Sequence, residues 1–230
     1  MKSRAPLPSG SEKARAVRGM FDTISGRYDL VNRIMTFGMD VGWRRRAVRE
    51  LHLSPGARVL DLACGTGDFC RDLARAGLRP AGFDFSFGML AAARTEAPLT
   101  QADILALPVA SGSADGITCG FALRNVVDLN SLFREMARVL RPGGRFALLE
   151  VSEPRNRLLR AGHNFYFGGV VPKIGGMLSD RSAYEYLPAS VAYLPPPNEM
   201  RAMLAAAGFT ELRRVHLLGG AAQLLLGTRS

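Results

Sequence analysis

The sequence predicts an α/β fold, built on a doubly wound, mostly parallel sheet of seven strands. Short apolar segments alternate with helical segments from Arg58 to Val151, which is typical of a parallel sheet with helices on both faces. Two further apolar segments flank Gly219-Gly220 and favour an antiparallel hairpin at the end of the sheet. Residues before position 54 show only helical periodicity, so a helical cap is expected ahead of the sheet.

These patterns divide the chain into three parts. Residues 1–13 are rich in Pro, Ser, Gly and Lys and are expected to form a disordered tail. Apolar residues recur every three or four positions over 14–53, with a break near 36–38, and predict the N-terminal helical cap. Residues 54–230 form the core, in which glycine, aromatic and proline clusters at about 155–195 predict a helical lid over the carboxyl edge of the sheet.

The strands and helices of the core follow from local signals in chain order. Ser86 is a helix N-cap residue, and Pro142-Gly143-Gly144 stops the helix that precedes it. Strands are expected at 59–62, 80–84, 99–102, 117–121, 145–151, 211–218 and 221–227. Helices are expected before Leu73 and over 86–96, 129–140 and 198–207.

Composition narrows the class of protein. Hydrophobic residues make up 47% of the chain and charged residues 22%, as in a soluble globular protein. No apolar run approaches the roughly 18 residues of a membrane span, and the N-terminus lacks the apolar stretch of a signal peptide. Three cysteines fit a reducing compartment, and the expected location is the cytoplasm, with peripheral membrane association left open. The net charge of +10 suits nucleic acid, an anionic membrane, an acidic substrate or merely a solvated arginine-rich surface.

The clearest chemical signal is the loop from Asp61 to Asp68, with the sequence DLACGTGD, between the first strand and a helix. Glycines at such a turn let a ligand approach the backbone at the helix N-terminus. A dinucleotide fingerprint would need a third glycine where Cys70 stands, and a phosphate-binding P-loop would need Gly-Lys-Ser/Thr. The loop therefore indicates a different ligand.

Acidic residues identify that ligand. Asp61 and Asp68 flank the glycines, where they would repel a phosphate but attract an ammonium or sulfonium group. Asp84 ends the second strand 17 residues after Gly67, close to the spacing at which an acid binds ribose hydroxyls. Asp103 ends the third strand and can face an adenine amino group. A cationic head, a ribose and an adenine together describe S-adenosylmethionine.

The chain resembles the demethylmenaquinone and 2-polyprenyl-6-methoxybenzoquinol C-methyltransferases, within the class I, Rossmann-like methyltransferases. The resemblance covers nearly all of 17–228. It rests on the motifs Met20–Asp29 with Trp43-Arg44-Arg45, Val59–Asp68, Leu123–Asp128, Arg138–Gly144, Glu150–Pro154 and Tyr184–Ser190.

The resemblance implies a cofactor site and an acceptor site. Cofactor binding is expected from Asp61, Gly65, Thr66, Gly67, Asp84, Phe85, Asp103, Ile104 and Gly120. Members of the family usually carry a serine where this chain has Gly120. The catalytic candidates are Tyr28, Arg124, Asn125 and Asp128. Arg124 is expected to hold a phenolate oxygen or a water while Asn125 and Asp128 orient it, the alternative being a structural Arg124–Asp128 pair. No metal is expected, because the cysteines lack metal-ligand spacing.

The implied reaction is methylation of a ring carbon of a prenylated hydroquinone, with demethylmenaquinol as the expected acceptor. A rival methyltransferase would act on a phospholipid amine or on a small molecule of secondary metabolism. A rival of another class is a non-catalytic module that keeps the cofactor site. A nucleic-acid partner is discounted, because Ala-Leu-Arg-Asn stands where base-amino methyltransferases carry Asn/Asp-Pro-Pro-Tyr/Phe. Contact with a membrane and a homodimer are left open.

Overall fold

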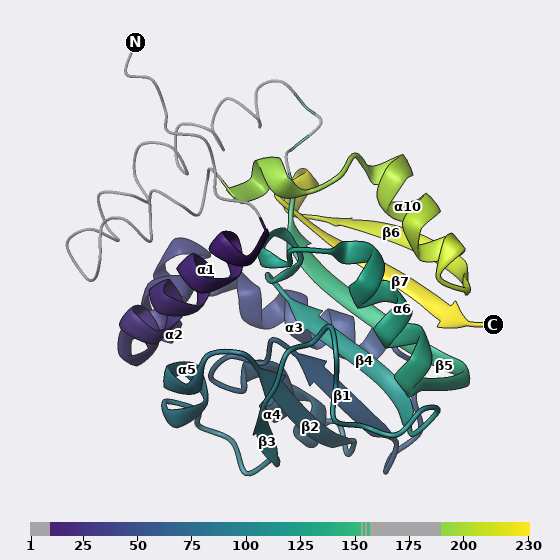
Figure 1. Ribbon diagram of the computed structural model, residues 1–230, viewed down its shortest axis with the longest axis horizontal. Coiled ribbons are helices and arrows are strands. Elements are labelled where there is room, and N and C mark those ends of the chain that lie inside the picture. Colours follow the sequence, from purple (N-terminus) through teal and green to yellow (C-terminus); the bar gives the residue numbers. More distant parts are fainter. Residues whose placement is uncertain (1–9, 153, 155, 157–189) are drawn as a thin grey trace.

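The computed structural model describes residues 10–152, 154, 156 and 190–230 (Figure 1). Its centre is a sheet of seven strands in the order β3-β2-β1-β4-β5-β7-β6. The strands are β1 (Arg58–Leu62), β2 (Arg79–Asp84), β3 (Leu99–Gln101), β4 (Ala114–Gly120), β5 (Leu140–Val151), β6 (Phe209–Leu217) and β7 (Ala222–Arg229). The first five strands of this order, β3, β2, β1, β4 and β5, pair in parallel with their neighbours. Strand β7 pairs antiparallel with both β5 and β6. The predicted doubly wound, mostly parallel sheet with a C-terminal hairpin is therefore confirmed.

Helices cover both faces of the sheet because the central strands are apolar on both sides. Phe146 and Leu148 of β5 join a core cluster with α6 and α10, while the alternate residues Ala147 and Leu149 join a second cluster with α3 and α4. The helices are α1 (Gly10–Ile24), α2 (Tyr28–Met35), α3 (Met39–Glu50), α4 (Asp68–Arg75), α5 (Phe87–Ala91), α6 (Leu129–Val139) and α10 (Pro197–Ala206). Short 3-10 turns are η1 (Ser25–Arg27), η2 (Leu123–Asn125), η4 (Val191–Tyr193) and η5 (Leu218–Gly220).

The N-terminal cap differs from the sequence prediction at two places. Helix α1 begins at Gly10, so residues 10–13, which we expected in the tail, are helical. Lys13 is buried there, since its Nζ donates to the carbonyl of Val126 at 2.9 Å and lies 3.7 Å from the centre of the Tyr193 ring. The turn η1 also separates α1 from α2, a break that the periodicity did not predict. The predicted break at 36–38 is confirmed, with Gly38 at φ +72°.

Element boundaries in the core shift by a few residues. Helix α5 ends at Ala91, well before the predicted Glu96. Strand β5 begins at Leu140, since Leu140 pairs with Ala114 ahead of the bulge between Ala114 and Gly116. Most of the predicted lid, namely 155 and 157–189, lies outside the described residues.

Candidate active site

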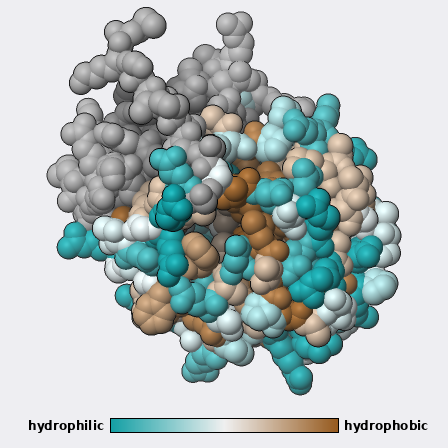
Figure 2. All heavy atoms as spheres, in the orientation of Figure 1, coloured by the Kyte–Doolittle hydropathy of each residue, from teal (hydrophilic) through white to brown (hydrophobic). Residues whose placement is uncertain are grey.

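A cavity opens at the carboxyl ends of the parallel strands, where β1 lies between β2 and β4. Strand order reverses there, and open α/β sheets bind ligands at such a point. The cap helices α1 and α2 stand beside this edge (Figure 1), and the cavity is lined from the cap, from the loop after β1, and from the ends of β2 and β4. Apolar side chains gather near the middle of the face in Figure 2, with hydrophilic ones around them.

The glycine loop forms the floor of the cavity. Gly65 lines it at φ +55°, a backbone conformation that favours glycine. A Cβ there would come within 3.0 Å of the Met89 side chain, so the loop packs tightly on α5. Gly67, at φ +81°, is the N-cap residue of α4, and a Cβ there would meet Thr95 at 2.6 Å. Gly67 thus shapes the loop without being among the lining residues.

Asp84 ends β2 and lies beside the loop. Its Oδ2 accepts the backbone N–H of Gly65 at 2.7 Å, and its Oδ1 accepts that of Ser86 at 2.8 Å. Burial raises the pKa of Asp84, although these backbone donors oppose the rise. Asp84 lines the cavity, and each of its carboxylate oxygens has a second lone pair beyond the one that accepts a backbone N–H, which suits a pair of ribose hydroxyls.

Asp61, at the inner end of the cavity, is 1% exposed. The Thr118 hydroxyl donates to its Oδ1 at 2.8 Å and the Cys70 thiol to its Oδ2 at 3.6 Å. Burial raises the pKa of Asp61 to about 7, so its carboxylate is desolvated and gains from a nearby positive charge. That is the environment which a sulfonium or ammonium group would stabilise.

The other predicted cofactor residues also line this cavity. Phe85, Asp103 and Ile104 form its outer wall, a mixture of apolar surface and one carboxylate that suits an adenine ring. Gly120 lies at the end of β4, and a Cβ there would come within 2.8 Å of the Phe69 ring. The missing side chain therefore makes room for Phe69 as well as removing a hydroxyl.

Tyr28 and Asn125 are the two catalytic candidates that line the cavity. Tyr28 begins α2 and packs edge-on against Phe21, with ring centres 5.8 Å apart. Burial raises the pKa of Tyr28 to about 12, against the opposing positive charge of Arg124. The hydroxyl is therefore protonated at neutral pH and is a hydrogen-bond donor.

Arg124 has partners other than those we expected. It is 5% exposed, its Nη1 pairs with Glu150 Oε1, and its Nε donates to the Ser190 hydroxyl at 3.2 Å. Asp128 is exposed and is the N-cap residue of α6, since it accepts the backbone N–H of Ser131 at 3.1 Å. Hydrogen bonds from Ser131 keep the pKa of Asp128 below its ordinary value. Asp128 is therefore neither the orienting group for Arg124 nor its structural partner.

The cap is tied to the cofactor loop by polar contacts. The Thr66 hydroxyl donates to Asp29 of α2 at 2.5 Å. Asp22 of α1 accepts both the Ser86 hydroxyl at 2.5 Å and the Gly88 N–H at 3.0 Å. The cap therefore holds Thr66, one of the predicted cofactor residues, directly.

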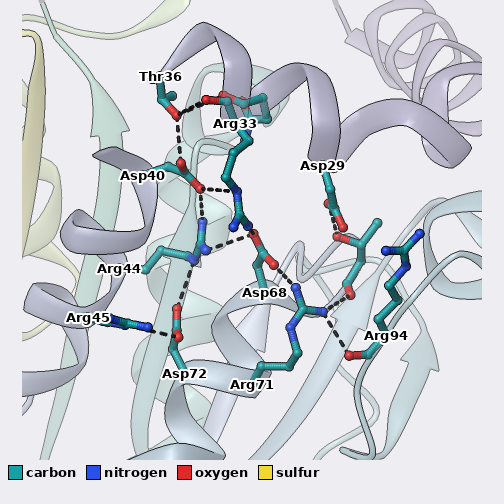
Figure 3. A network of polar contacts seen from close by, with 12 residues as sticks. Asp29, Arg33, Thr36, Asp40, Arg44, Arg45, Asp68, Arg71, Asp72 and Arg94 are labelled. Carbon is teal, nitrogen blue, oxygen red and sulfur yellow. Dashed lines mark hydrogen bonds and ion pairs between the residues drawn. The ribbon is translucent and has the colours of Figure 1, made fainter. Parts of the chain in front are cut away.

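A network of charged residues extends this connection (Figure 3). Arg44 of α3 lies at its centre and contacts three carboxylates. The distances to carboxylate oxygens are 2.5 Å from Nη1 to Asp40, 3.0 Å from Nη2 to Asp68 and 3.1 Å from Nε to Asp72. Asp68 also pairs with Arg33 at 3.6 Å and with Arg71. These arginines neutralise Asp68, so Asp61 is the acid better suited to attract a cation.

Sequence reasoning missed Asp29, Arg44 and Glu150. All three stand within motifs that carried the resemblance, and Glu150 is a charged residue at the end of an apolar strand. A charged residue at that position of a buried strand could have been predicted to have a functional or structural partner. Asp40 lies four residues before Arg44 on the same helix, α3, so this pair could have been inferred from spacing. Asp68 and Asp72 both come from α4, and their contact with Arg44 was not readable from the sequence.

The cavity residues fit S-adenosylmethionine: a glycine floor, a carboxylate able to accept ribose hydroxyls, an apolar wall of a kind that suits adenine, and a desolvated acid. In the described part of the chain, no three His, Cys, Asp or Glu side chains form a group suited to a metal ion.

Comparison with known proteins agrees with this arrangement. The model of the ubiE/COQ5 methyltransferase family matches residues 9–229. A ubiquinone/menaquinone biosynthesis C-methyltransferase from Geotalea uraniireducens is 40% identical over 95% of this chain and 98% of its own. A demethylmenaquinone methyltransferase from Roseiflexus castenholzii is 43% identical over 94% of both chains.

Solved structures support the fold. An S-adenosylmethionine-dependent methyltransferase from Thermotoga maritima is 19% identical, with a TM-score of 0.64 over 93% of this chain and 99% of its own. Together these matches confirm the predicted methyltransferase and its methyl donor, S-adenosylmethionine. The chain belongs to the ubiE/COQ5 methyltransferase family.

Proposed function

We propose that the protein methylates a ring carbon of a prenylated hydroquinone, with demethylmenaquinol as the acceptor and S-adenosylmethionine as the donor. The observation that carries the proposal is the cavity, which joins the cofactor residues to Tyr28 and Asn125. Identity of 40% or more to quinone C-methyltransferases along nearly the full chain supports the same acceptor class.

The donor supplies an electrophilic methyl group, and the protein must activate the acceptor carbon. Loss of the phenolic proton to water raises the electron density of the ortho carbon. This carbon forms the new C–C bond as the methyl–sulfur bond breaks and S-adenosylhomocysteine leaves, and the carbon then loses its own proton to water. The protonated Tyr28 hydroxyl donates a hydrogen bond to the phenolate oxygen and stabilises its charge. Asn125 orients the ring, and Arg124 adds positive charge behind this part of the wall.

The test is methyl transfer by the purified protein from S-adenosylmethionine to several acceptors, followed by mass spectrometry. Reduced demethylmenaquinone is expected to gain one CH2 in mass, and phosphatidylethanolamine is expected to gain nothing. Transfer to the phospholipid alone would support the N-methyltransferase alternative. Cofactor binding without transfer to any acceptor would support the non-catalytic one.

We also propose that the cap contacts an anionic membrane, which holds the prenyl tail of the acceptor. Leu30, Ile34 and Phe37 share one side of α2 and its C-terminal turn and are 58%, 37% and 72% exposed. Exposed arginines of the cap, Arg15, Arg18 and Arg33, complement anionic headgroups. None of the helices in the described part of the chain has the length and apolar character of a membrane span.

Vesicle flotation tests this contact. Phosphatidylglycerol vesicles should carry the protein and phosphatidylcholine vesicles should carry less. Leu30→Ser/Phe37→Ser should abolish flotation, whereas Leu218→Ser, at a residue 56% exposed in η5, is the matched control and should not. Equal loss in both variants would contradict a contact through the cap. The sequence leaves a homodimer open, and light scattering of the purified protein would measure its mass in solution.

A further inference from the structure

Glu150 is a buried carboxylate surrounded by hydrogen-bond donors at the end of β5. It is fully buried, with 0% exposure. Its Oε1 pairs with Arg124 Nη1 and accepts the backbone N–H of Val151 at 2.8 Å. Its Oε2 accepts the backbone N–H of Arg124 at 3.2 Å. Glu150 therefore holds both the main chain and the guanidinium of Arg124.

This position requires a carboxylate and does not suit an amide. Both oxygens of Glu150 face N–H donors. A glutamine would turn its own NH2 group toward one of those donors in either orientation, and it would leave the buried guanidinium without a counter-ion.

Arg124 lies immediately behind the acceptor end of the cavity. It belongs to η2, between the lining residues Ala122 and Asn125, and its charge acts on Tyr28. The Nε of Arg124 also donates a hydrogen bond to the Ser190 hydroxyl at 3.2 Å. The guanidinium thus has one fixed location, set by two elements far apart in the chain.

We propose that Glu150 is a positioning residue for the methyl transfer, which acts through Arg124 to fix the charge and the backbone beside Tyr28 at the acceptor site. The inference rests on the function proposed above. The guanidinium of Arg124 is the charged partner of Glu150, so the part of its effect on turnover that runs through this ion pair should vanish when the guanidinium is absent. An independent structural role would persist.

A double-mutant cycle separates these cases, with Glu150→Gln, Arg124→Met and the double variant. We expect each single variant to lower kcat about 10- to 100-fold, the range that a misplacement of about 1 Å can cost. The double variant should lose no more than either single variant, since the two side chains work as one unit. The cofactor Kd, measured by calorimetry, should stay within about twofold of wild type, because the cofactor residues lie elsewhere on the cavity wall.

Glu135→Gln is the matched control. Glu135 also accepts hydrogen bonds from an arginine side chain and from a backbone N–H: Arg138 Nη2 donates at 2.7 Å and the N–H of Leu107 at 2.6 Å. Unlike the elements around Arg124, Glu135 does not line the cavity. Its kcat should equal that of wild type. Wild-type kcat in folded Glu150→Gln would overturn the inference, as would losses that multiply in the double variant. A wild-type protein inactive on every quinol would instead overturn the proposed function, and the two failures are distinct.

Discussion

Arg44 is predicted to contribute more to stability than any exposed arginine of the charged network. Its side chain is 6% exposed, and it is the closest cation to Asp40, whose side chain is 1% exposed. It also lies 3.1 Å from Asp72, which is 3% exposed and whose other close partner, Arg75, is 65% exposed. Arg44→Met would leave these carboxylates buried with weakened compensation. Removing one partner of a buried ion pair costs about 3–5 kcal/mol. In a chain of this length each kcal/mol lowers Tm by about 2–4 °C, so the expected drop is about 6–20 °C.

The stability difference between wild type and Arg44→Met should also depend on pH. Burial alone would raise the pKa of Asp40, but hydrogen bonds from Thr36 and Arg44 outweigh it and hold that pKa below its ordinary value. A lowered pKa contributes stability that is present above the unfolded pKa, about 3.9, and is lost as pH falls through the folded one. The gap between wild type and Arg44→Met should therefore be full at neutral pH and shrink below about pH 4.

Urea denaturation across pH is the assay, with Arg45→Met as its control. Arg45 is 59% exposed and lies 3.9 Å from the same Asp72 carboxylate, so its loss should cost less than about 1 kcal/mol. An Arg44→Met variant within about 1 kcal/mol of wild type at neutral pH would refute the reasoning. So would equal losses in the two variants.

Four further predictions concern the cavity. Asp84→Asn should weaken cofactor binding about 10- to 100-fold in calorimetry, because an amide cannot accept both backbone N–H groups; unchanged affinity would contradict the assignment. Gly120→Ser should lower the free energy of unfolding by about 1–3 kcal/mol, and Phe69→Leu in the same chain should recover part of it; no loss would show that the ring moves freely. The raised pKa of Asp61, about 7, means that a cationic ligand should expel its proton, so affinity should rise with pH up to about 7 and calorimetry in two buffers at about pH 6 should detect proton release. Tyr28→Phe should lower kcat about 10-fold or more at constant cofactor Kd, and with a Tyr28 pKa of about 12 no tyrosine ionisation should appear in the wild-type rate profile below about pH 10.

The fold was predictable because its signals are local. Apolar strand segments, the Ser86 cap and the Gly219-Gly220 turn each specify an element from neighbouring residues, and the alternation of strands with helices predicts that the sheet is mostly parallel. The start of α1 was not predictable, since Gly10 to Lys13 resemble a tail until Lys13 meets Val126 and Tyr193. Only the folded chain brings these groups together.

The cofactor side of the cavity was predictable for the same reason: its residues sit at the ends of consecutive strands, so strand order brings them together. The partners of Arg124 were not. Asp128 is near in sequence, but its side chain is used by the N-terminus of α6, while Glu150 and Ser190 reach Arg124 from 26 and 66 residues away. Sequence proximity favoured the wrong carboxylate.

The proposed function requires that a ring carbon of a hydroquinone receives the methyl group. Its most direct test is incubation of the purified protein with methyl-deuterated S-adenosylmethionine and reduced demethylmenaquinone, followed by deuterium NMR of the product. We expect deuterium in a methyl group on the ring carbon, and none when Asp84→Ala replaces the wild type. Deuterium in an O-methyl group, or only in a lipid amine, would contradict it.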